Sequence, residues 1–381
     1  MMVKVFKLLV KKAVRKTFRL FNLEIVRAAS QDKAEYRPRK MRDALDMDGA
    51  GVDIYMYASP QDVLNKRKDF ERKLKSGHYK LESFSCPICS NDQDWLPVVS
   101  SKEPPFFQWS VCKRCGLLQL NKRLSDKDLN SFYESGEFHE IISGGMDDHT
   151  RFFDERMQAF FFIDIFNKLG CDANKLKILE IGCGSGGVLF ELKQQGAAVR
   201  GFDLDPHKIA YGKSHLREIE VGDALKMGDI NYEDFNFVLI SNVLEHLASP
   251  KKFLSSLSAR IKDDNTKILI DVPNLEGSHN YSSRSFLNFL HISHLWYFTS
   301  ISLERLLNAS GLKVDNIFNR GQSMSLICSK SDAEMQNTNN SYSLTISSIN
   351  YANYKLDKYN VELAIRKATA LGATMCKTGG K

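Results

Sequence analysis

Between residues 177 and 192 a strand-like apolar run leads through glycines into a helix-like pattern. The apolar positions on the two sides of the glycines are Ile178, Leu179, Ile181, Val188, Leu189 and Leu192. Between them lie Gly182, Gly184, Gly186 and Gly187. This order predicts a strand, a tight turn and a helix N-terminus, the unit that binds cofactors in open α/β sheets. Glycines let the backbone turn sharply there and approach a ligand closely.

Further apolar runs of strand character follow, and several end in a polar side chain. They cover residues 199–205, 221–224, 235–241, 268–274, 312–314 and 325–328. Helical patterns at 251–261 and 302–310 lie between the later runs. The alternation predicts an α/β fold with a Rossmann-like, seven-stranded, mostly parallel sheet and helices on both faces. The last two runs suit antiparallel strands.

Polar side chains stand where three of these runs end: Asp203, Asp223 and Asn242. Asp203 comes about 20 residues after the glycine turn, where a carboxylate can accept hydrogen bonds from both ribose hydroxyls of a nucleotide. Dinucleotide dehydrogenases use a similar loop, but they bind a pyrophosphate there. Glu180 lies two residues before the first glycine, where its charge opposes a pyrophosphate and suits a cationic amino acid group. A dehydrogenase and a structural Rossmann-like domain are the less favoured alternatives.

The order of these motifs resembles class I S-adenosylmethionine-dependent methyltransferases over about residues 145–330. The resemblance implies S-adenosyl-L-methionine as the cofactor. It implies these binding residues: Glu180, Gly182, Gly184, Gly186, Asp203, Asp223 and Asn242. By this resemblance Glu180 holds the ammonium group, Asp203 the ribose and Asp223 the adenine amino group, and Asn242 lies beside the methyl donor.

Two C-x-x-C pairs precede this region, Cys86 with Cys89 and Cys112 with Cys115, and 22 residues separate them. Each pair presents two thiolates at the spacing that one tetrahedral ion needs, and Gly116 frees the turn after the second pair. A disulfide or redox pair is the alternative. Four cysteines would close the coordination sphere, so the pattern predicts a structural Zn²⁺ in a small zinc ribbon that precedes the sheet.

The segment after the second pair extends the resemblance. A Gly-Leu-Leu-Gln-Leu strand at 116–120 and a helical pattern ending Phe-Tyr at 132–133 lead towards the methyltransferase motifs. This order resembles a bacterial family that includes sugar C-methyltransferases and methyltransferases of surface-polysaccharide and antibiotic gene clusters. The resemblance then covers about residues 84–330.

Members of that family carry a Tyr-x-Glu-His-x-x-Tyr-Phe pattern after the fifth strand, and its His is their proposed base. His294 matches this position and the Tyr-Phe pair at 297–298 matches its end, whereas His291 and Ser293 replace the family's Tyr and Glu. The resemblance makes His294 the expected base, with His291 as a second candidate. His246 is a candidate for substrate contact. A hydroxyl acceptor needs only one base, so O-methylation is favoured over C-methylation.

Residues 1–27 predict one amphipathic helix. Its apolar face comprises Phe6, Val10, Val14, Phe18 and Phe21, and Lys and Arg fill its flanks. Such helices lie on anionic membrane surfaces. Packing against the protein or a partner, and binding to nucleic acid, are the alternatives.

The net charge of +7 is concentrated at the N-terminus. Residues 1–42 hold thirteen Lys/Arg and three Asp/Glu, which gives +10, and the remaining 40 and 43 give −3. A body of this charge disfavours nucleic-acid binding, which needs a basic face. No run of 18 apolar residues and no signal peptide is found, and the paired cysteines suit metal binding in a reducing compartment. We therefore expect a cytoplasmic protein, with the N-terminal helix at the inner face of the membrane.

The predicted organisation has five parts: a basic helix (1–30), a linker with a charged helix (31–80), a zinc ribbon (81–140), a methyltransferase domain (141–330), and a polar linker with a C-terminal helix (331–381). The expected reaction is methylation of a hydroxyl or carbon of a nucleotide-sugar or membrane-associated glycan. The alternatives are an RNA methyltransferase whose ribbon contacts RNA, a methyltransferase of another small metabolite, and a non-catalytic scaffold.

Overall fold

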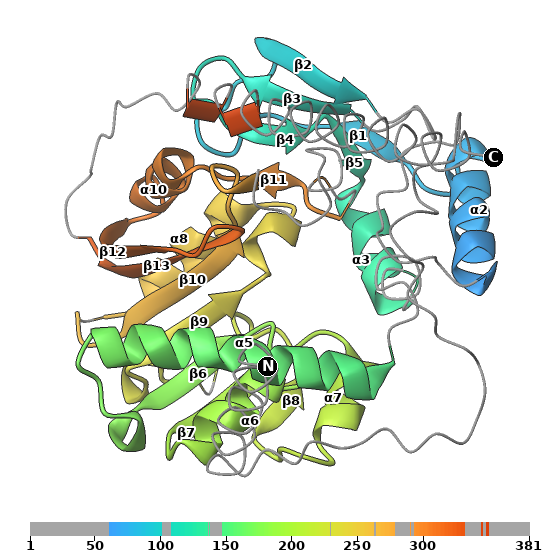
Figure 1. Ribbon diagram of the computed structural model, residues 1–381. Coiled ribbons are helices and arrows are strands. Elements are labelled where there is room, and N and C mark those ends of the chain that lie inside the picture. The colour runs from blue at the N-terminus through green and yellow to red at the C-terminus, as the bar shows by residue number, and fades with distance from the viewer. Residues whose placement is uncertain are drawn as a thin grey trace, which may run out of the picture. The chain divides into compact units, whose positions relative to one another are not determined.

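The computed structural model describes residues 61–100, 108–135, 137, 147–228, 230–262, 264–278, 290, 293–331, 344–345 and 348–349 (Figure 1). The predicted helix at residues 1–27, the candidate base His291 and most of the predicted segment 331–381 lie outside these residues. The predicted division into five parts is untested and stays a prediction.

A seven-stranded mixed sheet is present, as the sequence predicts. Its strands are β6 (Lys177–Ile181), β7 (Ala198–Asp203), β8 (Ile219–Val221), β9 (Phe237–Ser241), β10 (Lys267–Pro273), β12 (Leu312–Asn319) and β13 (Ser323–Lys330). Their order is β12-β13-β10-β9-β6-β7-β8. The five strands from β10 to β8 pair in parallel, and β13 is antiparallel to both β10 and β12. The carboxyl ends of the parallel strands therefore meet at one edge, where α/β sheets bind their ligands.

Helices cover both faces of this sheet. They are α5 (Asp148–Lys168), α6 (Gly187–Gln194), α7 (Pro206–Gly212), α8 (Pro250–Arg260) and α10 (Ser300–Asn308), with short 3₁₀ turns η1 (Ala173–Lys175), η2 (Tyr232–Asp234) and η3 (Leu244–His246). Buried residues of α5, α6 and α7 share one apolar cluster, and those of α8 and α10 belong to another. Successive strand residues enter opposite clusters, for example Ile178 and Leu179 on β6. Burial on both faces explains why the strands read as continuous apolar runs.

A smaller sheet contains the cysteine-rich segment. Its strands are β2 (Trp95–Ser100), β3 (Gln108–Cys112), β4 (Leu118–Leu120) and β11 (Trp296–Tyr297), in the order β11-β4-β3-β2 and all antiparallel. A separate pair joins β1 (Leu81–Ser83) to β5 (Lys122–Leu124), and α2 (Gln61–Lys75) and α3 (Asp126–Glu134) complete the described elements. Strand β11 comes from the predicted methyltransferase region, yet it pairs with β4.

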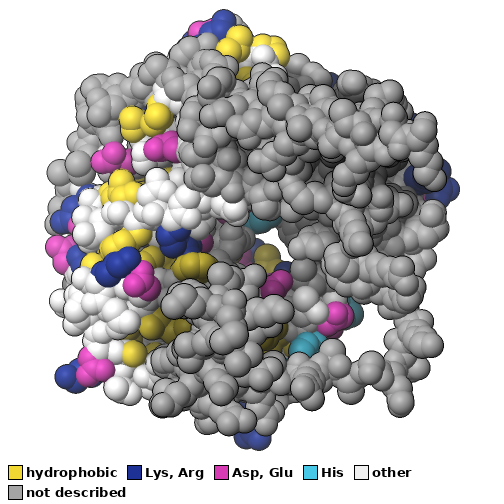
Figure 2. Space-filling model, in the orientation of Figure 1, with side chains coloured by type: hydrophobic (Ala, Val, Ile, Leu, Met, Phe, Trp, Pro, Cys, Tyr) yellow, Lys and Arg dark blue, Asp and Glu magenta, His cyan; other side chains and the backbone are white. Residues whose placement is uncertain are grey.

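The surface drawn in Figure 2 mixes acidic, basic and apolar side chains over the described residues, without gathering them by sign. Among the described helices, none is both long and apolar enough to cross a membrane.

Candidate functional site

The glycine turn between β6 and α6 has the left-handed backbone that only glycine adopts easily. The φ angles are +78° at Gly182, +57° at Gly184 and +80° at Gly186. A Cβ at Gly182 would collide with the side chain of Val243, and one at Gly184 would collide with Glu155. The turn therefore needs glycine both for its backbone angles and for the close approach of its neighbours.

Glu180 lies beneath this turn and is almost fully buried, with 2% of its surface exposed. Its Oε2 has no hydrogen-bond partner within the described part of the chain. Burial raises the pKa of this carboxyl well above its usual value, and the nearby acids Glu155 and Asp203 raise it further. A buried carboxylate without a partner is costly, and a cationic group beside it would remove that cost. The site thus fits the ammonium group of S-adenosylmethionine.

Asp203, the last residue of β7, links this strand to the glycine turn by a hydrogen bond. Its Oδ2 accepts a hydrogen bond from the Gly184 backbone N–H at 2.8 Å, and its Oδ1 accepts one from the Asp205 N–H at 2.8 Å. A carboxylate oxygen can accept a second hydrogen bond. Asp203 can therefore hold the turn and still accept from a ligand hydroxyl.

Asp223 follows β8 and bonds within its own loop. Its Oδ1 accepts from the Leu225 N–H at 3.1 Å, and its Oδ2 lies 3.1 Å from the Lys226 ammonium. The Lys226 side chain is 85% exposed, so this ion pair is weak and a ligand could displace it.

Asn242 follows β9 directly and has an exposed side chain at the carboxyl edge of the sheet. Its φ of +52° is unusual for a residue other than glycine, although Asn tolerates it better than most. The Asn242 backbone N–H donates to the Asp271 carbonyl of β10 at 3.0 Å. That bond anchors the strained residue where the two strands end.

Glu155 on α5 also belongs to this site, although no sequence pattern predicts it. Its carboxylate accepts hydrogen bonds from the Ser185 N–H and hydroxyl at 3.2 and 2.7 Å, and from the Gly187 N–H at 2.9 Å. Burial raises its pKa, and these three donors oppose that shift. Glu155 therefore occupies amides at the N-terminus of α6, which favour a negative group. Its partners lie about 30 residues away, so no local pattern could reveal it.

A second group of side chains lies just beyond β9. The ligand-type atoms of Glu245, His246 and His294 all lie within 4.8 Å of one another. The rings of His246 and His294 are 4.8 Å apart, edge to face. The Nδ1 of His246 lies 2.9 Å from the Ser293 carbonyl oxygen, which can only accept, so we assign a proton to Nδ1. The structure thus brings two of the predicted histidines together.

Glu245 was not predicted as a site residue. It is fully buried, and neither carboxylate oxygen has a hydrogen-bond partner among the described residues. Burial raises its pKa to about 8, and Asp271 adds to the shift. Its Oε1 is 3.9 Å from the His246 Nε2. Together with the two histidines, this carboxyl could exchange a proton or hold a divalent cation.

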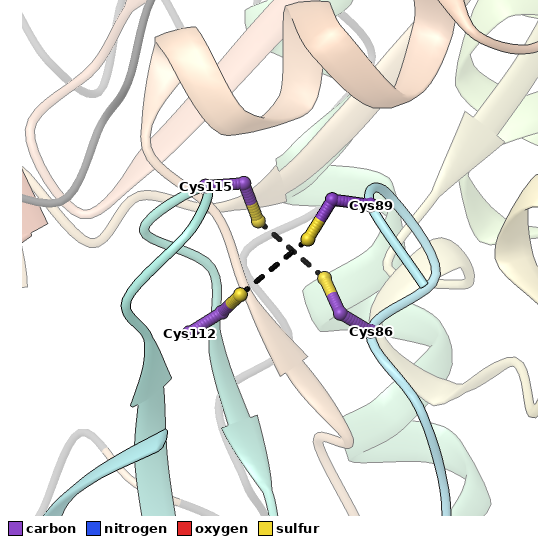
Figure 3. Close-up of side chains that lie close together, drawn as sticks. All are labelled: Cys86, Cys89, Cys112 and Cys115. Atoms are coloured by element: carbon purple, nitrogen blue, oxygen red, sulfur yellow. Dashed lines mark hydrogen bonds between the residues drawn. The ribbon is translucent and has the colours of Figure 1, made fainter. Parts of the chain in front are cut away.

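The four paired cysteines converge, as their spacing predicts (Figure 3). The sulfurs of Cys86 and Cys115 are 3.4 Å apart, and those of Cys89 and Cys112 are 3.5 Å apart. Within the described residues, none of the four forms a disulfide. A tetrahedral Zn²⁺ with Zn–S bonds near 2.3 Å would separate its sulfurs by about 3.8 Å, so the cluster fits such an ion after a small expansion.

The part of the chain that contains most of the large sheet is similar to known methyltransferases. Residues 152–317 match the family described as "Methyltransferase domain". Relatives named "Ubiquinone biosynthesis O-methyltransferase" include the mitochondrial protein of Schizosaccharomyces pombe (32% identity over 29% of this chain and 42% of that protein) and the Haemophilus ducreyi protein (32% over 27% and 50%). The chain thus spans about half the length of these relatives. A solved magnesium protoporphyrin IX methyltransferase from Synechocystis is 14% identical over 54% of this chain and all of that one, with a TM-score of 0.39.

These relatives correct one expectation and confirm another. The resemblance to sugar C-methyltransferases is not supported, and the predicted sugar or glycan acceptor is wrong, because the relatives are named as O-methyltransferases of ubiquinone biosynthesis. The misleading signals were the cysteine-rich segment and the loop at His294, where Ser293 and His291 already departed from the family pattern. The prediction of a methyltransferase is confirmed at the level of the domain: residues 152–317 match a methyltransferase domain.

Proposed function

We propose that this chain transfers a methyl group from S-adenosylmethionine to a hydroxyl oxygen of a small molecule, and that a quinone-precursor hydroxyl is the first acceptor to test. The names of the relatives support this acceptor class. The observation that carries the proposal is the group of Glu245, His246 and His294 just beyond β9, because it offers proton-accepting side chains next to the cofactor edge.

The cofactor side comprises Glu180, Asp203, Asp223 and Asn242, together with the glycine turn. Glu180 pairs with the ammonium group, Asp203 accepts from the ribose hydroxyls, and Asp223 accepts from the adenine amino group. Asn242 borders the donor at the end of β9. The Oε2 of Glu180, which has no hydrogen-bond partner among the described residues, supports the first assignment, and the remaining lone pairs of Asp203 support the second.

The bound cofactor supplies an activated methyl group on a sulfonium. The chain's own task is to orient the acceptor hydroxyl in line with the S–CH₃ bond and to exclude water. His294 takes the hydroxyl proton as the O–CH₃ bond forms and the C–S bond breaks, leaving neutral S-adenosylhomocysteine and a protonated imidazole. His246, fixed by the Ser293 carbonyl, contacts the acceptor.

A structural Zn²⁺ at Cys86, Cys89, Cys112 and Cys115 is the second part of the proposal. Four thiolates complete a tetrahedral sphere, so the ion would brace the turns of the small sheet and leave no open position for catalysis.

The test is methyl transfer from labelled S-adenosylmethionine to a panel of quinone-precursor phenols, other small hydroxylated metabolites and RNA. We expect label in a small hydroxylated acceptor, and a loss of about 10²–10⁴-fold in kcat for His294→Gln. His78→Gln changes an exposed histidine of the described surface in the same way and serves as the control. Label in RNA alone, or full activity of His294→Gln, would refute the proposal.

A further inference from the structure

The loop that carries His294 is built into the small sheet. Strand β11 begins two residues after His294 and pairs antiparallel with β4, with Trp296 opposite Gln119 and Tyr297 opposite Leu118. The sheet that contains Cys112 therefore extends to the edge of the group formed by Glu245, His246 and His294.

The backbone of Leu295 links the two sheets. Its N–H donates to the Glu245 carbonyl at 2.8 Å, and its carbonyl accepts from the Leu120 N–H at 3.0 Å. The residue next to His294 is thus held on one side by the chain that follows β9 and on the other by β4.

Trp296 adds a side-chain link at the same place. The residue is 1% exposed, and its Nε1–H donates to the Leu247 carbonyl at 2.8 Å, next to His246. The Phe84 ring packs edge-on against it, with the centroids 5.1 Å apart. One indole therefore joins the cysteine-rich segment to the chain that carries His246.

The cysteine turn sits at the start of β4. The Cys112 N–H donates to the Leu117 carbonyl at 2.8 Å, and the Gly116 N–H donates to the Cys112 carbonyl at 2.7 Å. The turn that brings Cys112 and Cys115 together thus leads directly into the strand that pairs with β11.

We propose that Trp296 is a positioning residue and that the small sheet, through β11, fixes His294 against His246. This inference rests on the proposed function, because it names what controls the geometry of the acceptor side. Cofactor binding depends on a different place: Glu180 and Asp203 lie on β6 and β7 of the large sheet. A shift of β11 therefore lowers turnover and leaves cofactor affinity in place.

The test compares Trp296→Phe with Trp109→Phe in the full chain. Trp109 is equally buried, on β3 of the same sheet, and its Nε1 has no hydrogen-bond partner within the described residues. Within the described residues, the same substitution therefore removes a hydrogen bond at Trp296 and none at Trp109. We expect Trp296→Phe to lower kcat roughly 5- to 100-fold, with the Kd for S-adenosylhomocysteine unchanged and Trp109→Phe near wild type.

A second readout does not depend on turnover. The ring ¹H–¹³C NMR signals of His246 and His294, assigned from their Gln variants, should shift in Trp296→Phe and stay in place in Trp109→Phe. Phe84→Leu, which loosens the packing on Trp296, should shift them in the same direction and provides a milder variant if Trp296→Phe does not fold.

Unchanged histidine signals in both Trp296→Phe and Phe84→Leu would overturn the positioning role. A rise in cofactor Kd that parallels the loss of kcat would also overturn it, because it would indicate general loosening. If the wild-type chain methylates no acceptor, the proposed function fails, and the histidine signals still decide the positioning role separately.

Discussion

Replacing Glu180 by Gln should weaken cofactor binding and, in the absence of cofactor, stabilise the fold. The Glu180 carboxyl is 2% exposed, has one oxygen without a partner in the described structure, and lies near Glu155 and Asp203. Its charge is therefore unfavourable until a cation arrives. A hydrogen bond to a charged group contributes about 1.5–3 kcal/mol. The Kd of the variant for the cofactor should therefore be roughly 10- to 150-fold higher than that of the wild type.

The stability effect has a definite pH dependence. Since the folded-state pKa of Glu180 lies above its unfolded value, the carboxyl costs no stability below the unfolded pKa of about 4.3, and the cost grows as pH rises towards the folded pKa. Glu180→Gln lacks this cost. At neutral pH the variant without cofactor should be more stable by about 1–3 kcal/mol, which corresponds to roughly 2–4 °C of Tm per kcal/mol for a domain of this size. The gain should vanish near pH 4.

Calorimetry can test both the predicted loss of cofactor affinity and the predicted gain in stability. Isothermal titration in buffers of different ionisation enthalpy should show proton release when wild-type protein binds S-adenosylmethionine, because the ammonium group lowers the raised pKa of Glu180. Glu180→Gln should release none. Glu82→Gln, at an exposed position on β1, is the matched control. A Glu180→Gln variant with wild-type affinity, or with a lower Tm at neutral pH, would refute the reasoning.

Three further changes probe other parts of the molecule. Gly184→Ala should cost about 1–3 kcal/mol in a urea titration, because its φ is +57° and its Cβ would collide with Glu155; wild-type stability would contradict the described turn. Asp203→Asn should raise the cofactor Kd about tenfold or more, since a neutral amide accepts hydrogen bonds less well than a carboxylate, and an unchanged Kd in the same titration would remove Asp203 from the site. Chelation should release stoichiometric zinc and change the tryptophan emission, because all three tryptophans lie in the small sheet, while cofactor affinity persists; a chain that never contains zinc would contradict the proposed ion.

The sequence predicted the large sheet well because its signals are local. The run through Ile178 and Leu179, the glycines and the acid at Asp203 each lie within one element and follow from periodicity and turn chemistry. The cysteine cluster could be predicted equally well, since each C-x-x-C pair is a four-residue turn whose spacing suits the binding of one ion.

Other parts depend on contacts between distant segments and left no local trace. Glu155 belongs to none of the predicted motifs, and only the packing of α5 brings it to the glycine turn. Glu245 directly precedes His246, a predicted substrate contact, but its complete burial could not be predicted from its neighbours in sequence. Strand β11 is two residues long, too short for any periodicity, and its partner β4 lies about 180 residues earlier.

The central claim, transfer of a methyl group from S-adenosylmethionine to oxygen, is tested most directly by ¹³C NMR. The wild-type chain is incubated with S-adenosylmethionine labelled at its methyl carbon and with the small acceptor that gives most label. We predict a new resonance in the region of oxygen-bound methyl groups, weaker when Asp203→Asn replaces the wild type at a cofactor concentration below the variant's Kd. A carbon-bound methyl resonance, or no transfer to any acceptor by protein that binds the cofactor, would contradict the account.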